Sequence, residues 1–321
     1  MTDLAKKGYV LGAVILLCFF LLIFTEEKVE FEKETLLWKF NVERIEFEPG
    51  AREWNREQHY IEEPVLLQRK GSLFDKYYFT VKTKDPQGKE LLYEGGYSVK
   101  NLFSELSTPR SRMVVSHTAE NMDKLGIEPG KSPVLHLYSG SEQKSITIGE
   151  KSSDGNLVYF TTGQGIYGLY SFIFEKLKDK VLFRERQIVS GIAESIKKIQ
   201  LKDASGTVRK LRNDEGVWKK QDQKASAAVE NAYRSLRSEL YPDQENGGGL
   251  DVALILVKDE PSHTLEFVTA DNTLIELKTY PPTNIKNVKY IPYVRSIRGQ
   301  FTESPAYMNK IVFDQFMKIF E

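Results

Sequence analysis

The sequence predicts an α+β protein, in which a single N-terminal transmembrane helix precedes a duplicated unit of antiparallel sheet and helices. Three observations lead to this prediction. A run without charges stands near the start of the chain, at Gly8–Phe24. Short stretches of alternating apolar and polar residues follow it, separated by turn residues, and such stretches are typical of strands in hairpins. The series of strand, helix, hairpin, strand pair and helix then occurs twice along the chain.

The composition is that of a folded protein with balanced charge. The chain has 321 residues, which is enough for about two or three domains. Its 40% apolar and 28% charged residues are typical of a globular protein rather than a disordered one. The 45 lysines and arginines equal the 45 aspartates and glutamates, whereas a nucleic-acid-binding protein usually has a basic excess. We therefore expect no nucleic-acid partner.

The uncharged run Gly8–Phe24 is long enough to cross a bilayer. Its 17 residues span about 26 Å as a helix, and Thr25 helps at the edge. A cleaved signal peptide needs small residues before the cut, and Leu22–Thr25 offers none. A lipoprotein signal needs a small residue before its cysteine, but Leu17 precedes Cys18. An uncleaved signal anchor fits best.

The charges on either side of the run predict its orientation. Lys6 and Lys7 precede it, and Glu26 and Glu27 follow it. Because positive flanks stay inside, the N-terminus is expected in the cytoplasm and the bulk of the chain outside it. The expected location is the bacterial inner membrane, with one crossing and a periplasmic body.

The membrane prediction divides the start of the chain into three parts. We expect a cytoplasmic tail at 1–7, a transmembrane anchor at 8–25 and a charged connector at 26–39. Cys18 is the only cysteine and lies inside the anchor. No disulfide, thiol chemistry or cysteine metal site is therefore expected in the exported part.

Residues 40–190 are predicted to form the first α+β unit. Its strands alternate apolar and charged residues, and its helices carry apolar residues three and four positions apart. The predicted elements are strands at 42–47, 66–67 and 76–82, a helix from Ser98 with Val99, Leu102, Phe103 and Leu106 on one face, a helix from Thr118 to Gly126, a hairpin of 134–138 and 144–148, strands at 157–160 and 166–170, and a helix capped by Ser171 with Phe172, Ile173, Phe174 and Leu177 inward.

Residues 191–321 are predicted to form the second unit, with a similar series. The alternative is that any α+β chain gives such a series by chance, since residue identity between the halves is low. The predicted elements are a strand at 195–201, a hairpin of 207–212 and 217–219, a helix at about 224–240, a flexible joint at Gly247–Gly249, a hairpin of 252–257 and 264–268, strands at 273–279 and 288–294, and a last helix opened by Ser304 and Pro305.

One glycine motif matches a cofactor fingerprint by letter. Gly163-Gln-Gly165-Ile-Tyr-Gly168 has the G-x-G-x-x-G spacing of dinucleotide-binding folds. In those folds the helix begins inside the motif, so that its N-terminus meets the pyrophosphate. Here the residues after Gly165 have a strand pattern, and the predicted helix starts only at Ser171. We interpret the glycines as turn residues and expect no cofactor.

The remaining residue types predict no reaction centre. The four histidines are scattered along the chain without metal-ligand spacing, and no G-x-S-x-G or S-x-x-K motif occurs. We therefore predict no catalytic, cofactor-binding or metal-binding residues and no enzyme activity. The three tryptophans are assigned to core packing. The residues in question are His59, His117, His136 and His263, with Trp38, Trp54 and Trp218.

The cluster Arg184-Glu185-Arg186 leaves two interpretations open. It stands beside the apolar pair Leu182-Phe183, where the two predicted units meet. Its charges either form a buried ion pair at this junction or are simply exposed to solvent.

Several short segments resemble the DUF4340 family. They include Lys124-Leu-Gly-Ile-Glu-Pro129, Thr147-Ile148-Gly149, Leu177-Lys-Asp179-Lys180 and Ile196-Lys-Lys-Ile-Gln-Leu201 followed by Trp218. The resemblance covers about residues 35–220 well and 220–321 loosely. It implies a bacterial envelope protein with one N-terminal span and an exported α+β repeat domain. The charged segment 48–95 departs from the family pattern.

The resemblance also implies a function, because members of this family look like companions of gliding-motility-type ABC export systems. We expect a membrane-anchored periplasmic accessory or scaffold protein that assists an envelope transport complex. The alternative is an exported glycan- or lipid-binding module, suggested by the 16 tyrosines and 18 phenylalanines. An exported hydrolase is a third class, but it requires clustered polar residues that the sequence does not indicate. The partner, the ligand and the oligomeric state are not predicted.

Overall fold

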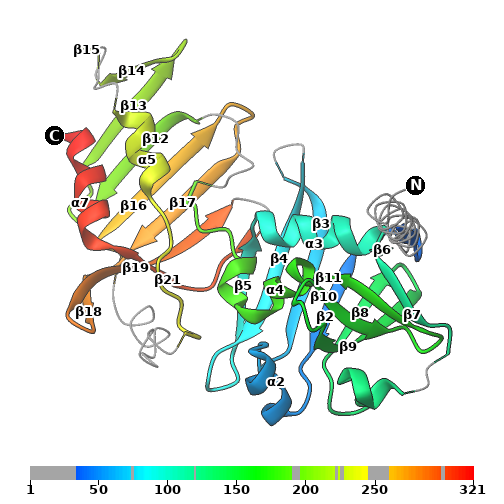
Figure 1. The fold of residues 1–321 in the computed structure, drawn as a ribbon. Helices are drawn as coiled ribbons and strands as arrows, with labels where there is room; N and C mark the ends of the chain where they lie inside the picture. The colour runs from blue at the N-terminus through cyan, green and yellow to red at the C-terminus, as the bar shows by residue number, and fades with distance from the viewer. Residues whose placement is uncertain are drawn as a thin grey trace, which may run out of the picture.

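Two large antiparallel sheets dominate the computed structural model, and the chain is α+β as predicted (Figure 1). The structure describes residues 34–73, 76–118, 121–189, 196–220, 223–224, 228–244, 260–297 and 301–321. The predicted tail, anchor and first part of the connector lie outside these ranges. In the described part, no helix combines the length and the apolarity that a membrane crossing requires. The membrane anchor therefore stays a prediction.

The first sheet has nine strands in the order β5-β4-β3-β2-β8-β9-β10-β11-β7. In β2, Ile45 and Phe47 are buried, whereas Arg44 and Glu46 point to the other face, as a period of two requires. A two-stranded ladder of β1 (Thr35–Leu36) and β6 (Arg110–Ser111) lies beside the sheet. The strands are β2 (Arg44–Glu48), β3 (Val65–Leu73), β4 (Lys76–Lys84), β5 (Glu90–Gly95), β7 (Met113–Ser116), β8 (Val134–Ser139), β9 (Glu142–Lys151), β10 (Leu157–Thr161) and β11 (Ile166–Tyr170).

Helices cover the apolar face of the first sheet. Helix α3 (Tyr97–Ser107) buries the predicted stripe of Val99, Leu102, Phe103 and Leu106, so this helix is confirmed. These residues share one core with the inward side chains of β2 and β8. The other elements of this unit are α2 (Arg52–Gln58), α4 (Ser171–Glu175) and the 3₁₀ turns η1 (Met122–Leu125), η2 (Lys176–Lys178) and η3 (Lys180–Phe183).

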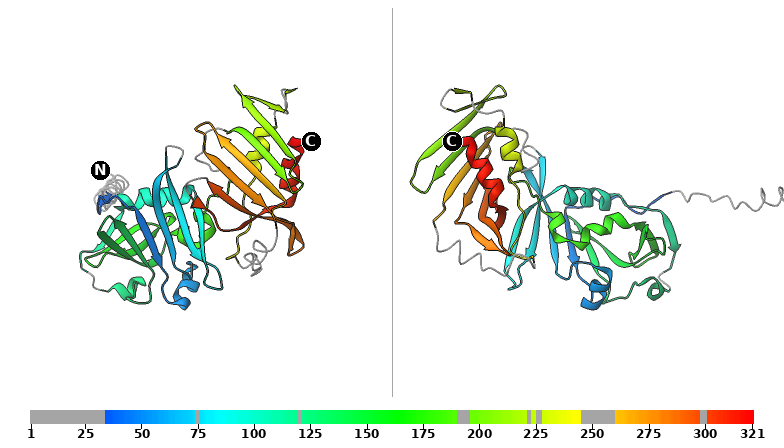
Figure 2. Two further views of the ribbon diagram at one scale, coloured as in Figure 1. Left: turned by 180° about the vertical axis from the view of Figure 1, so that it is seen from behind. Right: turned by 60° about the vertical axis from the view of Figure 1, so that its left-hand side comes forward.

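The second sheet has ten strands around the path β15-β14-β13-β12-β16-β17-β19-β18, with β20 and β21 also paired to β19. Helices α5 (Val229–Ser235) and α7 (Lys310–Met317), with η5 (Lys318–Phe320), pack on one face of it (Figure 2). The strands are β12 (Ile196–Asp203), β13 (Val208–Asp214), β14 (Val217–Lys220), β15 (Gln223–Lys224), β16 (His263–Thr269), β17 (Leu274–Thr279), β18 (Thr283–Ile285), β19 (Val288–Ile297), β20 (Phe301–Thr302) and β21 (Ala306–Asn309).

Corresponding strands follow the same order in both sheets. The path β5-β4-β3-β2-β8-β9-β10-β11 has its counterpart in β15-β14-β13-β12-β16-β17-β19-β21. Helices α3 and α5 follow the edge strands β5 and β15, and α4 and α7 follow β11 and β21. The predicted limit between the units, at 190/191, lies outside the described residues. The division into residues 40–190 and 191–321 therefore stays a prediction.

The predicted hairpins 134–148, 157–170 and 207–219 are confirmed by the pairing of β8 with β9, β10 with β11 and β13 with β14. The predicted strand 252–257 and the joint Gly247–Gly249 lie outside the described residues. Of the predicted helix 118–126, the described part is the single turn η1, which ends at Gly126 in the left-handed region expected of a C-cap (φ 66°).

Three expectations about helices were wrong. The helix predicted at 224–240 is described only as α5, because residues 236–240 bond instead to neighbouring chain segments, as in Ser238 N–H to the Arg186 carbonyl at 2.7 Å. The last helix does not open at Ser304 and Pro305. Residues 306–309 form β21 against the free edge of β19, and Asn309 caps α7 by accepting from Ile311 N–H at 2.8 Å. Phe172, predicted inward, is 52% exposed.

Candidate functional site

The edge strand β5 is the point at which the two sheet units meet (Figure 1). An unpaired strand edge exposes backbone donors and acceptors, and here other chain segments cover them. Gly96 N–H donates to the Phe183 carbonyl at 2.8 Å, and Glu185 N–H donates to the Glu94 carbonyl at 2.8 Å. Further along the strand, Ser304 N–H donates to the Leu92 carbonyl at 2.8 Å. The segment 48–95, which departs from the family pattern, thus supplies the strand that joins the units.

The first charged cluster of the junction is built on Arg184, whose side chain is fully buried. Its guanidinium binds the Asp243 carboxylate through two nitrogens, with Nη1 to Oδ1 at 2.8 Å. It also lies 4.3 Å from the ring centres of both Tyr93 and Tyr241. Thr83 Oγ1 donates to Asp243 at 3.2 Å, so that β4 and β5 of the first sheet are joined to residues 241–243.

Electrostatics keep this pair charged. Burial alone would raise the pKa of Asp243, but the hydrogen bonds and charge of Arg184, with a further contribution from Lys180, outweigh it and hold the pKa below its ordinary value. Burial would lower the pKa of Arg184, and the hydrogen bonds and charge of Asp243 raise it instead. The two groups therefore form a buried ion pair near neutral pH.

A second charged cluster lies around Arg295 of β19, which is 1% exposed. Its Nη2 atom lies 2.7 Å from Glu94 and 2.7 Å from Glu303, and its Nε atom lies 2.6 Å from the other oxygen of Glu303. Its Nη1 atom donates to the carbonyls of Gln187 and Ile188 at 3.0 Å each. All the polar hydrogens of this guanidinium face acceptors, and three chain segments converge on one side chain.

These clusters resolve the alternatives for Arg184-Glu185-Arg186. Arg184 forms the buried ion pair, whereas Arg186 is exposed and donates from Nε to the Ser238 carbonyl at 3.1 Å. Glu185 is half-buried and accepts from Gln187 N–H at 2.9 Å. The cluster therefore divides between the two interpretations.

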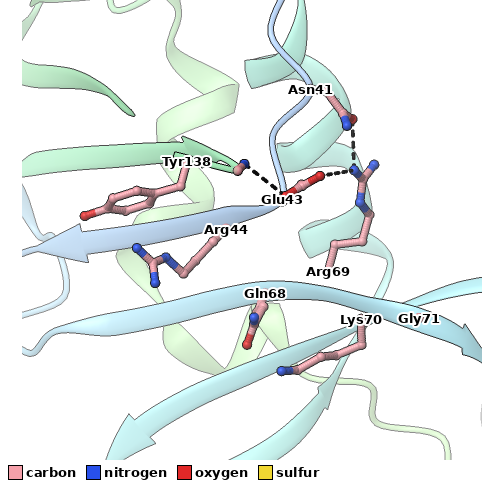
Figure 3. Close-up of a pocket in the computed structure, with 9 residues that line it drawn as sticks. Asn41, Glu43, Arg44, Gln68, Arg69, Lys70, Gly71 and Tyr138 are labelled. Carbon is pink, nitrogen blue, oxygen red and sulfur yellow. Dashed lines mark hydrogen bonds and ion pairs between the residues drawn. The ribbon is translucent and has the colours of Figure 1, made fainter. Parts of the chain in front are cut away.

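A polar pocket lies on the first sheet away from β5, at the start of β2, along the second half of β3 and at the end of β8 (Figure 3). Its volume is about 490 Å³. Its lining includes two arginines and one lysine but only one carboxylate. The lining residues are Asn41, Glu43, Arg44, Gln68, Arg69, Lys70, Gly71, Tyr138 and Gly140.

Cross-strand contacts order the pocket walls. Glu43 accepts from Gly140 N–H at 3.1 Å and lies 3.8 Å from Arg69, whose Nη2 also donates to Asn41 at 2.9 Å. On the neighbouring wall, the Arg44 guanidinium lies 3.8 Å above the Tyr138 ring, directly across the strand pair. The pocket can therefore offer cationic donors in fixed positions.

The glycine motif and the histidines lie neither at the β5 junction nor in the pocket formed by β2, β3 and β8. Gly163, with a φ of 91°, occupies the turn between β10 and β11, and α4 begins only at Ser171. His136 bonds to Ser145 and Glu48 on the sheet surface, and burial lowers the pKa of His263 beside Phe313. His59 ends α2, and His117 is exposed after β7. In the described part of the chain, no group of three or more His, Cys, Asp or Glu is arranged to hold a metal.

The tryptophans serve the cores, as predicted. Trp54 stacks on Tyr60, and Trp218 packs against Tyr233 in the second core. Trp38 is half-buried and donates to the Leu106 carbonyl at 3.0 Å.

The sequence did not identify the second charged cluster or the pocket. One signal for the cluster was present. Arg295 alternates with Tyr293 and Ile297 in a strand pattern, which places a charge on the face that these apolar residues bury. No local signal marked Glu94 or Asp243 as partners, because they lie far along the chain from Arg295 and Arg184. Glu303 lies only eight residues after Arg295, in a segment for which the sequence predicts no strand.

Comparison with known proteins bears on the first sheet, the junction and part of the second unit. Residues 93–241 match the family described as "Domain of unknown function (DUF4340)". The match starts later than the predicted extent of 35–220 and runs further, because it begins in β5 and ends after α5. No curated protein and no solved structure matches the chain. The chain thus contains a DUF4340 domain, which spans residues 93–241 and includes Glu94 and Arg184 of the charged junction.

Proposed function

We propose that the protein is a membrane-anchored accessory or scaffold protein of a bacterial envelope, which presents its two sheet units to an ABC-type transport complex outside the cytoplasm. The observation that carries this proposal is the junction around β5, where buried charges hold residues from both units. The predicted anchor and the resemblance described above suggest the envelope context, whereas the family match itself is to a domain of unknown function.

The junction supports a scaffold because it resists separation of the units. Pulling them apart would separate Glu94 from Arg295 and Arg184 from Asp243, and an unpaired buried charge is strongly destabilising. Two units in a fixed orientation can present sheet edges and helix faces to a partner without first losing the entropy of ordering them. The anchor would raise the local concentration of these surfaces near the membrane.

The two units are, in our proposal, the products of an internal duplication. Its support is the common order of eight strands in both sheets, together with helices at equivalent points of the chain. A duplicated unit gives a scaffold two similar surfaces, and the core of the second sheet also takes in Leu91 and Tyr93 of β5.

Affinity isolation tests the scaffold proposal. The full chain would be tagged after Glu321 and isolated from gently solubilised membranes, and transporter components would be quantified in the eluate. A tagged chain of residues 1–39 controls for association through the anchor alone. Enrichment of a transporter component with the full chain but not with the control supports the proposal. Recovery of the full chain without such a component contradicts it.

A topology experiment tests the orientation separately. A reporter that is active only outside the cytoplasm, fused after Glu321, is expected to be active. A reporter that is active only in the cytoplasm, fused at the same place, serves as the control. The reverse result would overturn both the orientation and the extracytoplasmic role.

A further inference from the structure

We propose that the pocket formed by β2, β3 and β8 binds a small molecule through an anionic oxygen group, a carboxylate or a phosphoryl. The inference is independent of the scaffold proposal, because it concerns a surface of the first sheet away from the β5 junction. It rests on the charge of the pocket, on an orientated arginine and on a lysine, Lys70, for which the described residues supply no ion-pair partner.

The charge of the pocket favours an anion. Arg44, Arg69 and Lys70 line it together with one carboxylate, Glu43. That carboxylate is occupied by the Gly140 N–H at 3.1 Å and by Arg69 at 3.8 Å. The lining residues therefore carry a net charge of +2, which Glu46 beside Arg44 at 3.5 Å offsets in part, and a negatively charged ligand would meet a net attraction there.

Arg44 is held in position, but its Nε–H group has no hydrogen-bond partner among the described residues. Its guanidinium lies 3.8 Å above the Tyr138 ring, and the Tyr138 hydroxyl donates to Glu46 at 2.8 Å. The Nε atom of Arg44 is buried and has no hydrogen-bond partner within the described ranges, with its contact to Glu46 no closer than 3.5 Å. A guanidinium held over a ring in this way can donate two parallel hydrogen bonds to a carboxylate or phosphoryl group.

Lys70 adds a second cation on the same side of the sheet. Gln68 faces Arg44 across the strand pair, and Lys70 follows Gln68 by two positions along β3. Arg44, Gln68 and Lys70 therefore extend from the same face, as Figure 3 shows. Lys70 is half-buried and forms no ion pair with any other residue that the structure describes. It can serve as a point charge beside the arginine fork.

The size of the pocket limits the ligand. A volume of about 490 Å³ lies within the range of small-molecule sites. It accommodates a single sugar acid or a small phosphate ester, whereas a polymer could place only one residue in it. The Gln68 amide and the Asn41 side chain supply neutral polar groups that would suit hydroxyls beside the anionic group.

Calorimetric titration of the full chain in detergent tests the inference. The probes are inorganic phosphate, glucuronate and glucose, each titrated at low and at high salt. We expect saturable binding of phosphate, of glucuronate or of both, weakened by salt, with no binding of glucose. Binding of phosphate alone assigns the phosphoryl class, and binding of glucuronate alone assigns the carboxylate class. Absence of saturable binding for both anions overturns the inference.

Matched variants locate the binding. Lys70→Gln is expected to weaken anion binding by about tenfold, because it removes one charge-assisted hydrogen bond. Arg44→Lys keeps the charge but loses the fork, and a similar loss is expected. Lys210→Gln removes an exposed lysine of β13 and should leave binding unchanged. Thermal melts verify that all three variants fold. Wild-type affinity in folded Lys70→Gln and Arg44→Lys would overturn the assignment to this pocket.

Discussion

Replacing Arg295 with methionine is predicted to destabilise the chain by about 3–5 kcal/mol, the range for breaking a buried ion pair. Arg295 is 1% exposed and holds two carboxylates that are themselves buried, those of Glu94 and Glu303. Methionine fills much of the same volume, so loss of charge pairing dominates over any cavity. The variant would leave two like charges in the junction without a cation.

A second substitution in the same chain separates charge from packing. Glu303→Gln removes one of the two stranded charges and keeps a side-chain oxygen that can accept from Glu94 N–H, a bond of 2.7 Å in the structure. Added to Arg295→Met, it is expected to recover about 1–3 kcal/mol, although on its own it should destabilise the chain. Glu303→Gln is thus expected to stabilise the Arg295→Met chain but to destabilise the wild-type chain, and such a change of sign shows that the two residues are energetically coupled.

Urea denaturation measures both effects. Unfolding of the full chain in detergent would be followed by tryptophan fluorescence, with Trp38 and Trp54 reporting on the first unit and Trp218 on the second. Arg209→Met, at an exposed position of β13, is the control and should change the unfolding free energy by less than about 0.5 kcal/mol. If Arg295→Met costs no more than this control, or if Glu303→Gln adds to its cost, the reasoning about the junction is refuted.

Three further perturbations test individual elements. Asp243→Asn is expected to destabilise the chain above about pH 4. The pKa of Asp243 is lower in the folded chain than in the unfolded chain, so the carboxylate stabilises the fold at pH values above its unfolded-state pKa. This stabilisation is lost as the pH falls through the folded-state pKa, and the stability difference between Asp243→Asn and wild type should therefore shrink in acid. A difference that is unchanged down to about pH 2 would contradict the pairing. Gly50→Ala would place a methyl 2.0 Å from a backbone carbonyl and is expected to lower stability by about 1–3 kcal/mol, whereas Gly71→Ala, which meets nothing within 4 Å, should be nearly neutral in thermal melts. Asn309→Ala should cost about 1 kcal/mol by removing the side-chain cap of α7, and Asn309→Asp should retain most of it; equal losses would exclude a capping role.

Patterns that are local in the sequence predicted much of the fold. The hairpins of β8 with β9 and of β10 with β11 follow from apolar alternation interrupted by glycine turns. Helix α3 was identified because its four apolar residues repeat with the helical period before a proline. In such segments, each residue's own neighbours along the chain decide its conformation.

Distant contacts decided the elements that the sequence misplaced. Residues 306–309 became a strand because the edge of β19 offers backbone partners, and this pairing overrides the helix start suggested by Pro305. The ion pairs that cross the junction join residues more than fifty positions apart, Arg184 with Asp243 and Arg295 with Glu94. A sequence pattern can show that a charge faces inward, but it does not show which acid will meet it.

The most direct test of the scaffold account is whether the two units move as one body. Spin labels at Glu142→Cys and Lys210→Cys, both exposed and one on each unit, would be introduced into a full chain carrying Cys18→Ser, because Cys18 is the only native cysteine. Pulsed electron–electron distance measurements are then expected to give one narrow distribution, which broadens when Arg295→Met is added. A broad or two-peaked distribution in the chain with an intact junction would contradict the account.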